Sequence, residues 1–498
     1  MQTARHHWPA VLVLVGLALA LFGTAVPAAS GAVSLQPISQ DPYTNQYSQH
    51  KTQVEPHVLA VGGTLVAAFQ TGRFFAGGSS DIGWARSIDD GQNWTPGFLP
   101  GLTVFESAGT YASASDPTVA YDQKHDVWMI ASLGLFPGPT PGTFADPSDV
   151  LVSRSIDGAQ SWQSPVMVAG NGVENLDKPW VVCDNTPASP FYGNCYATFD
   201  NFGSNNIILM STSTDGGQTW SAEQQPSDLL RGIGGVPLVR PDGTVVVPIQ
   251  GYHSGRAYID AFTSDDGGAT WSASTHISQI AFYSIPLSTQ KNIRSDVLPS
   301  AAIDSNGKIF VTWNDCGLDQ GCSRNNVVFA TSADGVTWSK VKRVPLDAAD
   351  DRADYVSPSI GIDPDTAGAS ARIGLTTYAV PNPNCKPARC TVAIDFASST
   401  DGGKHWTRGK EIQAPMRFRW APATSSGYMF GDYFATAVSS DGKAVPVLSV
   451  ALAPTTTLQQ AISSARMSIV AGSFGTRAEG GRASVPPTDE AAVHRTRR

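Results

Sequence analysis

The 498-residue sequence predicts an all-β fold, a β-propeller of four-stranded antiparallel blades. Two observations predict it. A short motif built on Ser, Asp, Gly and Trp recurs at intervals of 51 to 68 residues, and the segments between its copies are short alternating or apolar runs bounded by turn residues. Each interval is long enough for four short strands. No long run with a 3.6-residue apolar period interrupts the pattern, so we expect no long helices.

The motif reads Ser87-Ile-Asp89-Asp-Gly91-Gln-Asn-Trp94 at its first copy. Ser and Asp side chains can accept or donate hydrogen bonds at nearby backbone groups, Gly supplies positive φ, and Trp buries a large apolar area just past the turn. We therefore interpret each copy as a lock on the turn between the third and fourth strands, with a structural rather than a catalytic Asp. Five further copies, one with Ala159 for the second glycine and one a residue shorter, begin at Ser155, Ser213, Ser264, Ser332 and Ser399.

Six copies predict six blades, and a seventh is preferred over a six-bladed alternative. Residues 433–438, 444–448 and 461–465 have the composition of three strands, and 33–37 could supply the fourth from the other end of the chain. Such closure would cover sheet edges that otherwise invite aggregation. The propeller is thus expected over residues 31–472, followed by a polar, disordered tail over 473–498.

Residues 1–30 have the composition of a signal peptide. Arg5 precedes an apolar run, and the small residues Ala28, Ala29 and Ser30 follow it. The alternative is an uncleaved anchor, since about 20 apolar residues can span a bilayer. We prefer cleavage because no charged stop follows, which predicts a secreted protein without a membrane span in its mature part.

The six cysteines predict three local disulfides in an exported chain. The pairs are Cys183 with Cys195, Cys316 with Cys322, and Cys385 with Cys390. Zinc is the weaker alternative, because no CxxC spacing occurs and no histidine sits beside the pairs.

Charge and composition limit the classes of partner that the sequence predicts. The net charge is −9 without a basic stripe, which argues against a nucleic acid. We expect a monomer without a cofactor. Calcium among clustered carboxylates is the alternative, although no EF-hand-like loop is present.

The repeated S-x-D-x-G-x-x-W pattern resembles the Asp-box, or BNR, repeat of the sialidase superfamily, over roughly residues 51–467. The resemblance implies a propeller fold and a glycan-directed function; propellers with such repeats also include proteins that only bind. Sialidases carry a Phe/Tyr-Arg-Ile-Pro motif near the first blade, whereas this chain has Val54-Glu-Pro-His57 there. An acid thus stands where an arginine would grip the sialic acid carboxylate, and no catalytic residue is carried over.

A ligand site is expected on the face opposite the Asp boxes, around the central channel. Acids recur where innermost strands are expected to start: Glu55, Asp116, Asp177, Asp296, Asp354 and Asp432. Basic and aromatic residues expected in loops of the same face include Arg73, Arg256, Arg294, Arg324, Arg352 and Trp420. Mixed charge with aromatic rings suits a sugar. Each acid alone could instead bond neighbouring backbone N–H groups and tie blades together.

Two functions stay open. One is an exo-acting glycoside hydrolase of sialidase-like architecture, which needs two carboxylates or a tyrosine activated by an acid. Its candidate catalytic residues are Asp296, Asp354 with Tyr355, and Asp432 with Tyr433. The other is a non-catalytic propeller that binds glycans or proteins at the cell surface. A converging arginine cluster on the channel floor would favour the enzyme.

Overall fold

The computed structural model describes residues 1–2, 33–138, 144–282, 293–295, 297–319, 321–347, 353–385 and 389–478. The chain divides into a first unit, Met1–Ala32, and a second unit, Val33–Arg498, whose described part is referred to below as the folded unit. The segment interpreted as a signal peptide lies outside the described residues, apart from its first two. Among the residues described, no helix is long and apolar enough to cross a membrane.

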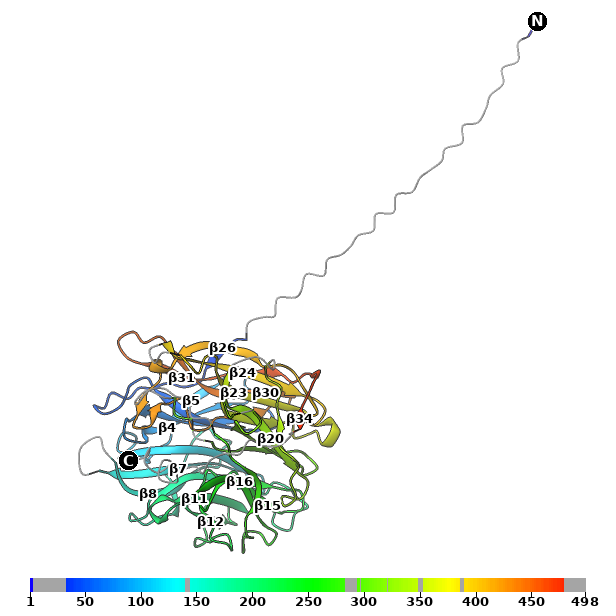
Figure 1. The fold of residues 1–498 in the computed structure, drawn as a ribbon. Coiled ribbons are helices and arrows are strands. Elements are labelled where there is room, and N and C mark those ends of the chain that lie inside the picture. The colour runs from blue at the N-terminus through cyan, green and yellow to red at the C-terminus, as the bar shows by residue number, and fades with distance from the viewer. Residues whose placement is uncertain are drawn as a thin grey trace. The chain divides into compact units, whose positions relative to one another are not determined.

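The folded unit is a β-propeller of antiparallel sheets, as the repeat predicts (Figure 1). Its first sheet has eight strands, joined in the middle by the single pair Ser79↔Ala114, so that it consists of two four-stranded halves. The strands are β2 (Gln53–Val61), β3 (Thr64–Arg73), β4 (Ser79–Ser87) and β5 (Thr95–Phe98), then β6 (Ser113–Asp122), β7 (Val127–Pro137), β8 (Phe144–Ser155) and β9 (Val166–Ala169).

The middle of the chain forms four more sheets in sequence order. The first two contain β10 (Leu176–Cys183), β11 (Cys195–Asn201) and β12 (Ile207–Ser213), then β13 (Gly232–Ile233), β14 (Leu238–Val239), β15 (Val245–His253), β16 (Arg256–Ser264) and β17 (Thr275–Gln279). The next two contain β18 (Ser300–Ile303), β19 (Ile309–Asp315), β20 (Asn326–Ser332) and β21 (Lys342–Arg343), then β22 (Asp354–Ile362), β23 (Ile373–Val380), β24 (Thr391–Ser399) and β26 (Lys410–Arg417). Short elements complete this part: β27 (Ala423–Thr424), β28 (Gly427–Tyr428) and the 3-10 turns η1 (Phe202–Ser204), η2 (Gly368–Ser370) and η4 (Phe418–Trp420).

The last sheet takes strands from both ends of the folded unit. It contains β29 (Ala435–Val438), β30 (Lys443–Leu452), β31 (Gln459–Ser464) and β32 (Met467–Ser468). Strand β1 (Gln36–Pro37) pairs with β31, Gln36 opposite Ser464. The edge of β31 is thereby covered by the opposite end of the chain, and the count of seven blades stays a prediction.

The predicted disordered tail begins at residue 473, and this prediction is wrong for the paired residues within 474–478. Strand β33 (Phe474–Gly475) pairs with β25 (His405–Trp406), and β34 (Arg477–Ala478) pairs with β21. Backbone pairing thus holds residues 474–478, although their side chains give no strand signal in the sequence. Residues 479–498 lie outside the described part.

In all six Asp boxes the Ser hydroxyl accepts from the backbone N–H at the turn and donates to the Asp carboxylate. In the first, the backbone N–H of Gly91 donates to Ser87 Oγ at 2.9 Å, Ser87 Oγ donates to Asp89 Oδ1 at 2.8 Å, and Trp94 Nε1 donates to the Gly91 carbonyl at 3.1 Å. The hydrogen bond from the box Trp to the box Gly carbonyl is made by Trp94 and Trp406 and not by the other four. Hydrogen bonds from the Asn93 side chain and backbone lower the pKa of Asp89 to about 2. Its carboxylate is a fixed acceptor for the turn, which supports a structural role.

The three predicted disulfides are present. Cys183, the last residue of β10, lies opposite Cys195, the first residue of β11. The other two close short loops. Such bridges fit an oxidising compartment.

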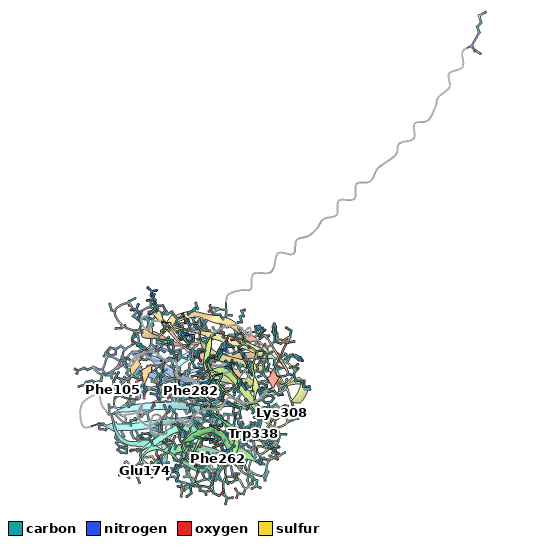
Figure 2. All side chains as sticks on the ribbon, viewed as in Figure 1. Phe105, Glu174, Phe262, Phe282, Lys308 and Trp338 are labelled. Atoms are coloured by element: carbon teal, nitrogen blue, oxygen red, sulfur yellow. A yellow bond between two sulfur atoms is a disulfide. The ribbon has the colours of Figure 1, made fainter. Side chains whose placement is uncertain are left out.

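The hydrophobic core lies between neighbouring sheets. Leu65 and Phe69 of β3 pack with Val445 and Val447 of β30, so the first sheet rests on the last. Phe262 of β16, labelled in Figure 2, packs with Tyr196 of the preceding sheet and with an Asp-box Trp. Sheets packed face to face leave their innermost strands to line the centre.

Candidate functional site

The candidate site is built on bulges in four innermost strands. Strands β2, β6, β10 and β22 each break register around a residue in the left-handed region that precedes a proline. The four residues are Glu55, Asp116, Lys178 and Ser357, with φ between 47° and 52°. Proline has no N–H to lose from the ladder, and a bulge re-aims the side chain. Strained backbone of this kind costs on the order of 1–3 kcal/mol per residue and is often found at functional sites.

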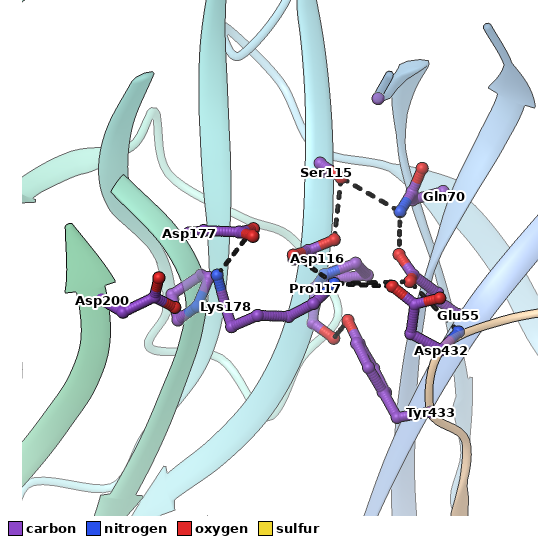
Figure 3. Close-up of polar contacts among 12 residues, drawn as sticks. Glu55, Gln70, Ser115, Asp116, Pro117, Asp177, Lys178, Asp200, Asp432 and Tyr433 are labelled. Carbon is purple, nitrogen blue, oxygen red and sulfur yellow. Dashed lines mark hydrogen bonds and ion pairs between the residues drawn. The ribbon is translucent and has the colours of Figure 1, made fainter. Parts of the chain in front are cut away.

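The bulges bring Glu55, Asp116 and Lys178 together (Figure 3). Lys178 Nζ lies 2.9 Å from Asp116 Oδ2, 3.0 Å from Asp432 Oδ2 and 3.7 Å from Glu55 Oε1. All four side chains are at most 5% exposed. An ammonium group thus occupies the centre of a buried triangle of carboxyl groups.

Asp432 pairs with a second cation, Arg294, in addition to Lys178. Arg294 Nε donates to Asp432 Oδ1 at 2.7 Å, and the Arg294 Nη2 contacts the other oxygen, which is a two-pronged ion pair. The Asp432 N–H donates to Glu55 Oε1 at 3.2 Å. This close approach depends on Gly431 (φ 136°), where a Cβ would lie 3.1 Å from the Glu55 nitrogen and 2.7 Å from the Tyr433 carbonyl.

Polar side chains of the first sheets hold the acids in place. Gln70 donates to Glu55 Oε2 and, at 3.1 Å, to Ser115 Oγ, which in turn donates to Asp116 Oδ1 at 2.8 Å. Arg73 Nη1 donates to Gln70 Oε1 at 2.7 Å and to the Gly78 carbonyl at 3.0 Å. The network fixes which oxygen of each acid faces Lys178.

Burial and neighbouring charges shift the pKa values of Glu55 and Asp116 in opposite directions. Burial raises the pKa of Glu55 to about 8, against the opposing charge of Lys178 and with reinforcement from Asp116 and Asp432. Burial is the largest influence on Asp116 and acts to raise its pKa, but the charge and hydrogen bond of Lys178, together with hydrogen bonds from Glu55 and Asp177, hold that pKa below its usual value. The three acids together keep the pKa of Lys178 well above its usual value despite burial. These pKa shifts favour a protonated Glu55 beside an ionised Asp116 and a charged Lys178 near neutral pH.

We expect Glu55→Gln to flatten the pH dependence of stability. Glu55 has a folded-state pKa of about 8 against about 4.3 in an unfolded chain, so between these values the folded state holds one more proton. Stability should then fall as pH rises across this window, by at most about 1.4 kcal/mol per pH unit, and Gln removes that contribution. Urea unfolding at pH 5, 6, 7 and 8 measures the slope. The exposed Glu411→Gln is the matched control and should parallel the wild type; equal slopes for wild type and Glu55→Gln would contradict the assignment.

A cavity of about 180 Å³ opens above the network. Arg73, Asp116, Lys178 and Arg294 form part of its lining, with polar and aromatic groups from other segments: Asn175, Asp177, Phe202, Ser425 and Ser426. It lies at the strand ends opposite the Asp boxes, because Gln53 at the start of β2 pairs with Thr71, whereas Ser87 of the first box pairs with Leu65 at the far end of β3.

Five of the expected residues lie in or against this network: Glu55, Arg73, Asp116, Arg294 and Asp432. Asp177 lies on the cavity wall, where its carboxylate accepts from the Lys178 backbone N–H at 2.9 Å. Tyr433 lies beside the network, but its hydroxyl donates to the Pro117 carbonyl at 3.0 Å rather than to Asp432. Burial, followed by the charge of Glu55, raises the pKa of Tyr433 well above its usual value, so it is a poor nucleophile.

Asp354 and Arg324 belong to a second cluster. Asp354 accepts from the Asn325 N–H at 2.9 Å, and burial raises its pKa to about 6. Arg324 pairs with Asp319 at 2.8 Å and with Asp347 at 3.2 Å. Tyr355 is buried in the core beneath, and its activation by Asp354 stays a prediction.

The remaining expected residues lie elsewhere. Arg256 is exposed at the start of β16, opposite His253. Trp420 is half-buried against the core at η4. Asp296 and Arg352 lie outside the described residues.

Lys178 is the central residue that the sequence interpretation missed. The sequence points to its acidic neighbour Asp177, yet the bulge places Lys178 at the position equivalent to Glu55 and Asp116. The available signal was the following proline, shared by Glu55-Pro, Asp116-Pro and Lys178-Pro. The ammonium also stands where a calcium ion among these carboxylates would have to bind.

One comparison with known proteins identifies the repeat. The BNR repeat-like domain family matches residues 138–414. Similar solved structures include a Hadza microbial sialidase (17% identity, TM-score 0.42, 66% of this chain and 63% of that one) and the NanB sialidase from Streptococcus pneumoniae (14%, 0.44, 87% and 71%). An alpha-L-arabinofuranosidase from Fusarium graminearum is a third (14%, 0.44, 74% and 98%). The chain spans less than two thirds of the first of these proteins. Because the family match extends over more than half of its length, this chain belongs to the BNR repeat-like family.

Proposed function

We propose that this protein is a glycan-binding β-propeller whose site is the cavity above Lys178. The observation that carries the proposal is a cavity of about 180 Å³ over a rigid, charged floor, at the strand ends away from the Asp boxes. Typical small-molecule sites measure about 300–1,000 Å³, so this one suits a single terminal sugar ring. Its described lining is rich in hydroxyl, amide and charged groups, which suit a ligand with many hydroxyls.

The charge pattern favours binding over hydrolysis. A glycosidase needs two carboxyl groups that reach the glycosidic bond. Here Asp116 and Asp432 bond to Lys178 and Arg294, and Glu55 is fully buried beneath them. The network therefore supports a preformed binding floor, with Arg294 and Asp177 closest to a ligand by virtue of their partial exposure.

A glycoside hydrolase is the second candidate, on one specific observation. Glu55, with its pKa raised to about 8, and ionised Asp116 divide into an acid and a base within one network. That division is typical of paired catalytic carboxyls. It requires an opening of the network that exposes Glu55 to the ligand.

A glycan array and a panel of aryl glycosides test both candidates on the purified protein. We expect array binding without hydrolysis. Asp177→Asn should weaken binding about 10- to 100-fold, the range for one hydrogen bond to a charged group. The matched control is Asp265→Asn, an exposed acid in an Asp box, which should bind like the wild type.

The outcomes separate the candidates. If the wild type releases an aryl group and Glu55→Gln does not, the protein is a hydrolase and the binding proposal is wrong. Equal binding by Asp177→Asn, Asp265→Asn and wild type would move the site away from this cavity. We further propose export to an oxidising compartment, supported by the three disulfides.

A further inference from the structure

Three adjacent strands place His253, Asp260 and His276 on one face of the sheet that contains β13 to β17. His253 ends β15, Asp260 lies in β16 and His276 in β17. A register shift between Ile259 and Asp260 sets His276 directly opposite Asp260. The tight turn at Ser254-Gly255, both with positive φ, brings His253 back over β16.

The three side chains converge through their ligating atoms. His253 Nε2 lies 2.6 Å from Asp260 Oδ2, and His276 Nδ1 lies 2.6 Å from Asp260 Oδ1. All the ligating atoms lie within 4.8 Å of one another. Each imidazole therefore contacts a different oxygen of one carboxylate, and the three residues offer their ligating atoms within one small volume.

Two neighbouring residues, Gly251 and Tyr258, make room for these side chains and orient them. Gly251 lies on the same face, and a Cβ there would collide with Asp260 Oδ2 and come within 3.3 Å of His253 Nε2. Tyr258 stacks on His276 with ring centroids 4.3 Å apart and an interplanar angle of 16°. Glycine thus leaves space for the cluster, and the tyrosine fixes the plane of one imidazole.

An ionised, buried Asp260 costs free energy unless a full positive charge lies beside it. The Asp260 side chain is 0% exposed, whereas His253 and His276 are 30% and 53% exposed. A divalent cation would supply the missing charge on the open side.

We propose that His253, Asp260 and His276 bind a divalent first-row transition metal, with zinc as the representative ion. Two imidazoles and one carboxylate, with further positions open to water, are a ligand set that zinc and its neighbours accept. Zinc bonds of about 2.0–2.1 Å place tetrahedral ligand atoms roughly 3.3 Å apart. The 2.6 Å contacts therefore need to open by less than 1 Å, which the partly exposed histidines allow.

Co²⁺ absorption and Zn²⁺ calorimetry on the untagged full-length protein test the site. The wild type should bind one equivalent of Zn²⁺ that Co²⁺ can replace, with visible bands of an imidazole-ligated ion. His276→Gln and Asp260→Asn should each weaken binding by about 10-fold or more. His125→Gln is the matched control: His125 Nδ1 makes the same 2.6 Å contact, with Asp122, but as a pair rather than a triad.

Circular dichroism establishes that each variant is folded, and the half-exposed His276→Gln keeps the test valid if Asp260→Asn does not fold. Zinc affinity lost in His276→Gln and retained in His125→Gln supports the site. Equal affinity in these two variants and the wild type, or no zinc binding by the wild type, overturns it. None of these readouts depends on glycan binding.

Discussion

Lys178→Met should lower the free energy of unfolding at pH 7 by about 3–5 kcal/mol, as expected when one partner of a buried ion pair is removed. Methionine keeps the length and apolar stem of lysine but leaves Asp116, Asp432 and Glu55 without the central ammonium. Arg294 still compensates Asp432. The main loss therefore falls on Asp116, whose low pKa depends on Lys178.

The sign of the pH dependence distinguishes lost charge from lost packing. In the wild type, the depressed pKa of Asp116 contributes stability that is present above about pH 4 and disappears as pH falls through the folded-state pKa. In Lys178→Met, burial without compensation should raise the pKa of these acids. They then take up protons on folding, so the deficit relative to wild type should shrink from pH 7 to pH 5.

Urea unfolding at both pH values measures the effect, with the exposed Lys124→Met as the matched control for the loss of one positive charge. The control should stay within about 0.5 kcal/mol of wild type. A deficit in Lys178→Met that is no larger than that of the control, or that grows toward pH 5, would show that the ammonium does not hold the network together.

The fold could be predicted because its signal is local. Each Asp box contains within eight residues all the groups that make its turn, from the Ser87 hydroxyl to the Trp94 ring. The pairing of β33 and β34 could not be predicted, because it depends on backbone groups of β25 and β21 that are brought close only by the assembled sheets.

The sequence predicts where this candidate site lies but does not predict the residue at its centre. Ring closure brings the expected acids Glu55, Asp116 and Asp432 together around Lys178, and their role in a ligand site stays a prediction. Which residue of Asp177-Lys178 turns inward is decided by a bulge, and a shift of one residue reverses the face of a strand.

The histidine cluster depends on the same kind of shift. Histidines at 253 and 276 are 23 residues apart and show no metal-binding spacing. Only the irregular register between β16 and β17 sets one of them opposite Asp260. Register irregularities therefore account for both of the residue sets that sequence interpretation overlooked.

Trp406→Ala should lower the free energy of unfolding by about 3–5 kcal/mol, as for other fully buried tryptophans. Trp406 is 0% exposed, packs edge-on against Phe329 and belongs to a core that joins the sheets of β20 and β23. Its backbone also pairs with Phe474 of β33, so collapse of the ring's cavity would loosen the far end of the chain.

Trp94→Ala separates burial from the hydrogen bond that both tryptophans make. Trp94 Nε1 and Trp406 Nε1 each donate to the carbonyl of the box glycine at 3.1 Å, but the Trp94 ring is only half-buried. Urea unfolding should show a clearly smaller loss for Trp94→Ala, because less apolar surface returns to water. Glycan binding by the folded fraction of both variants should match the wild type. Equal stability losses would show that the turn hydrogen bond, and not burial of the ring, is what the box tryptophan contributes.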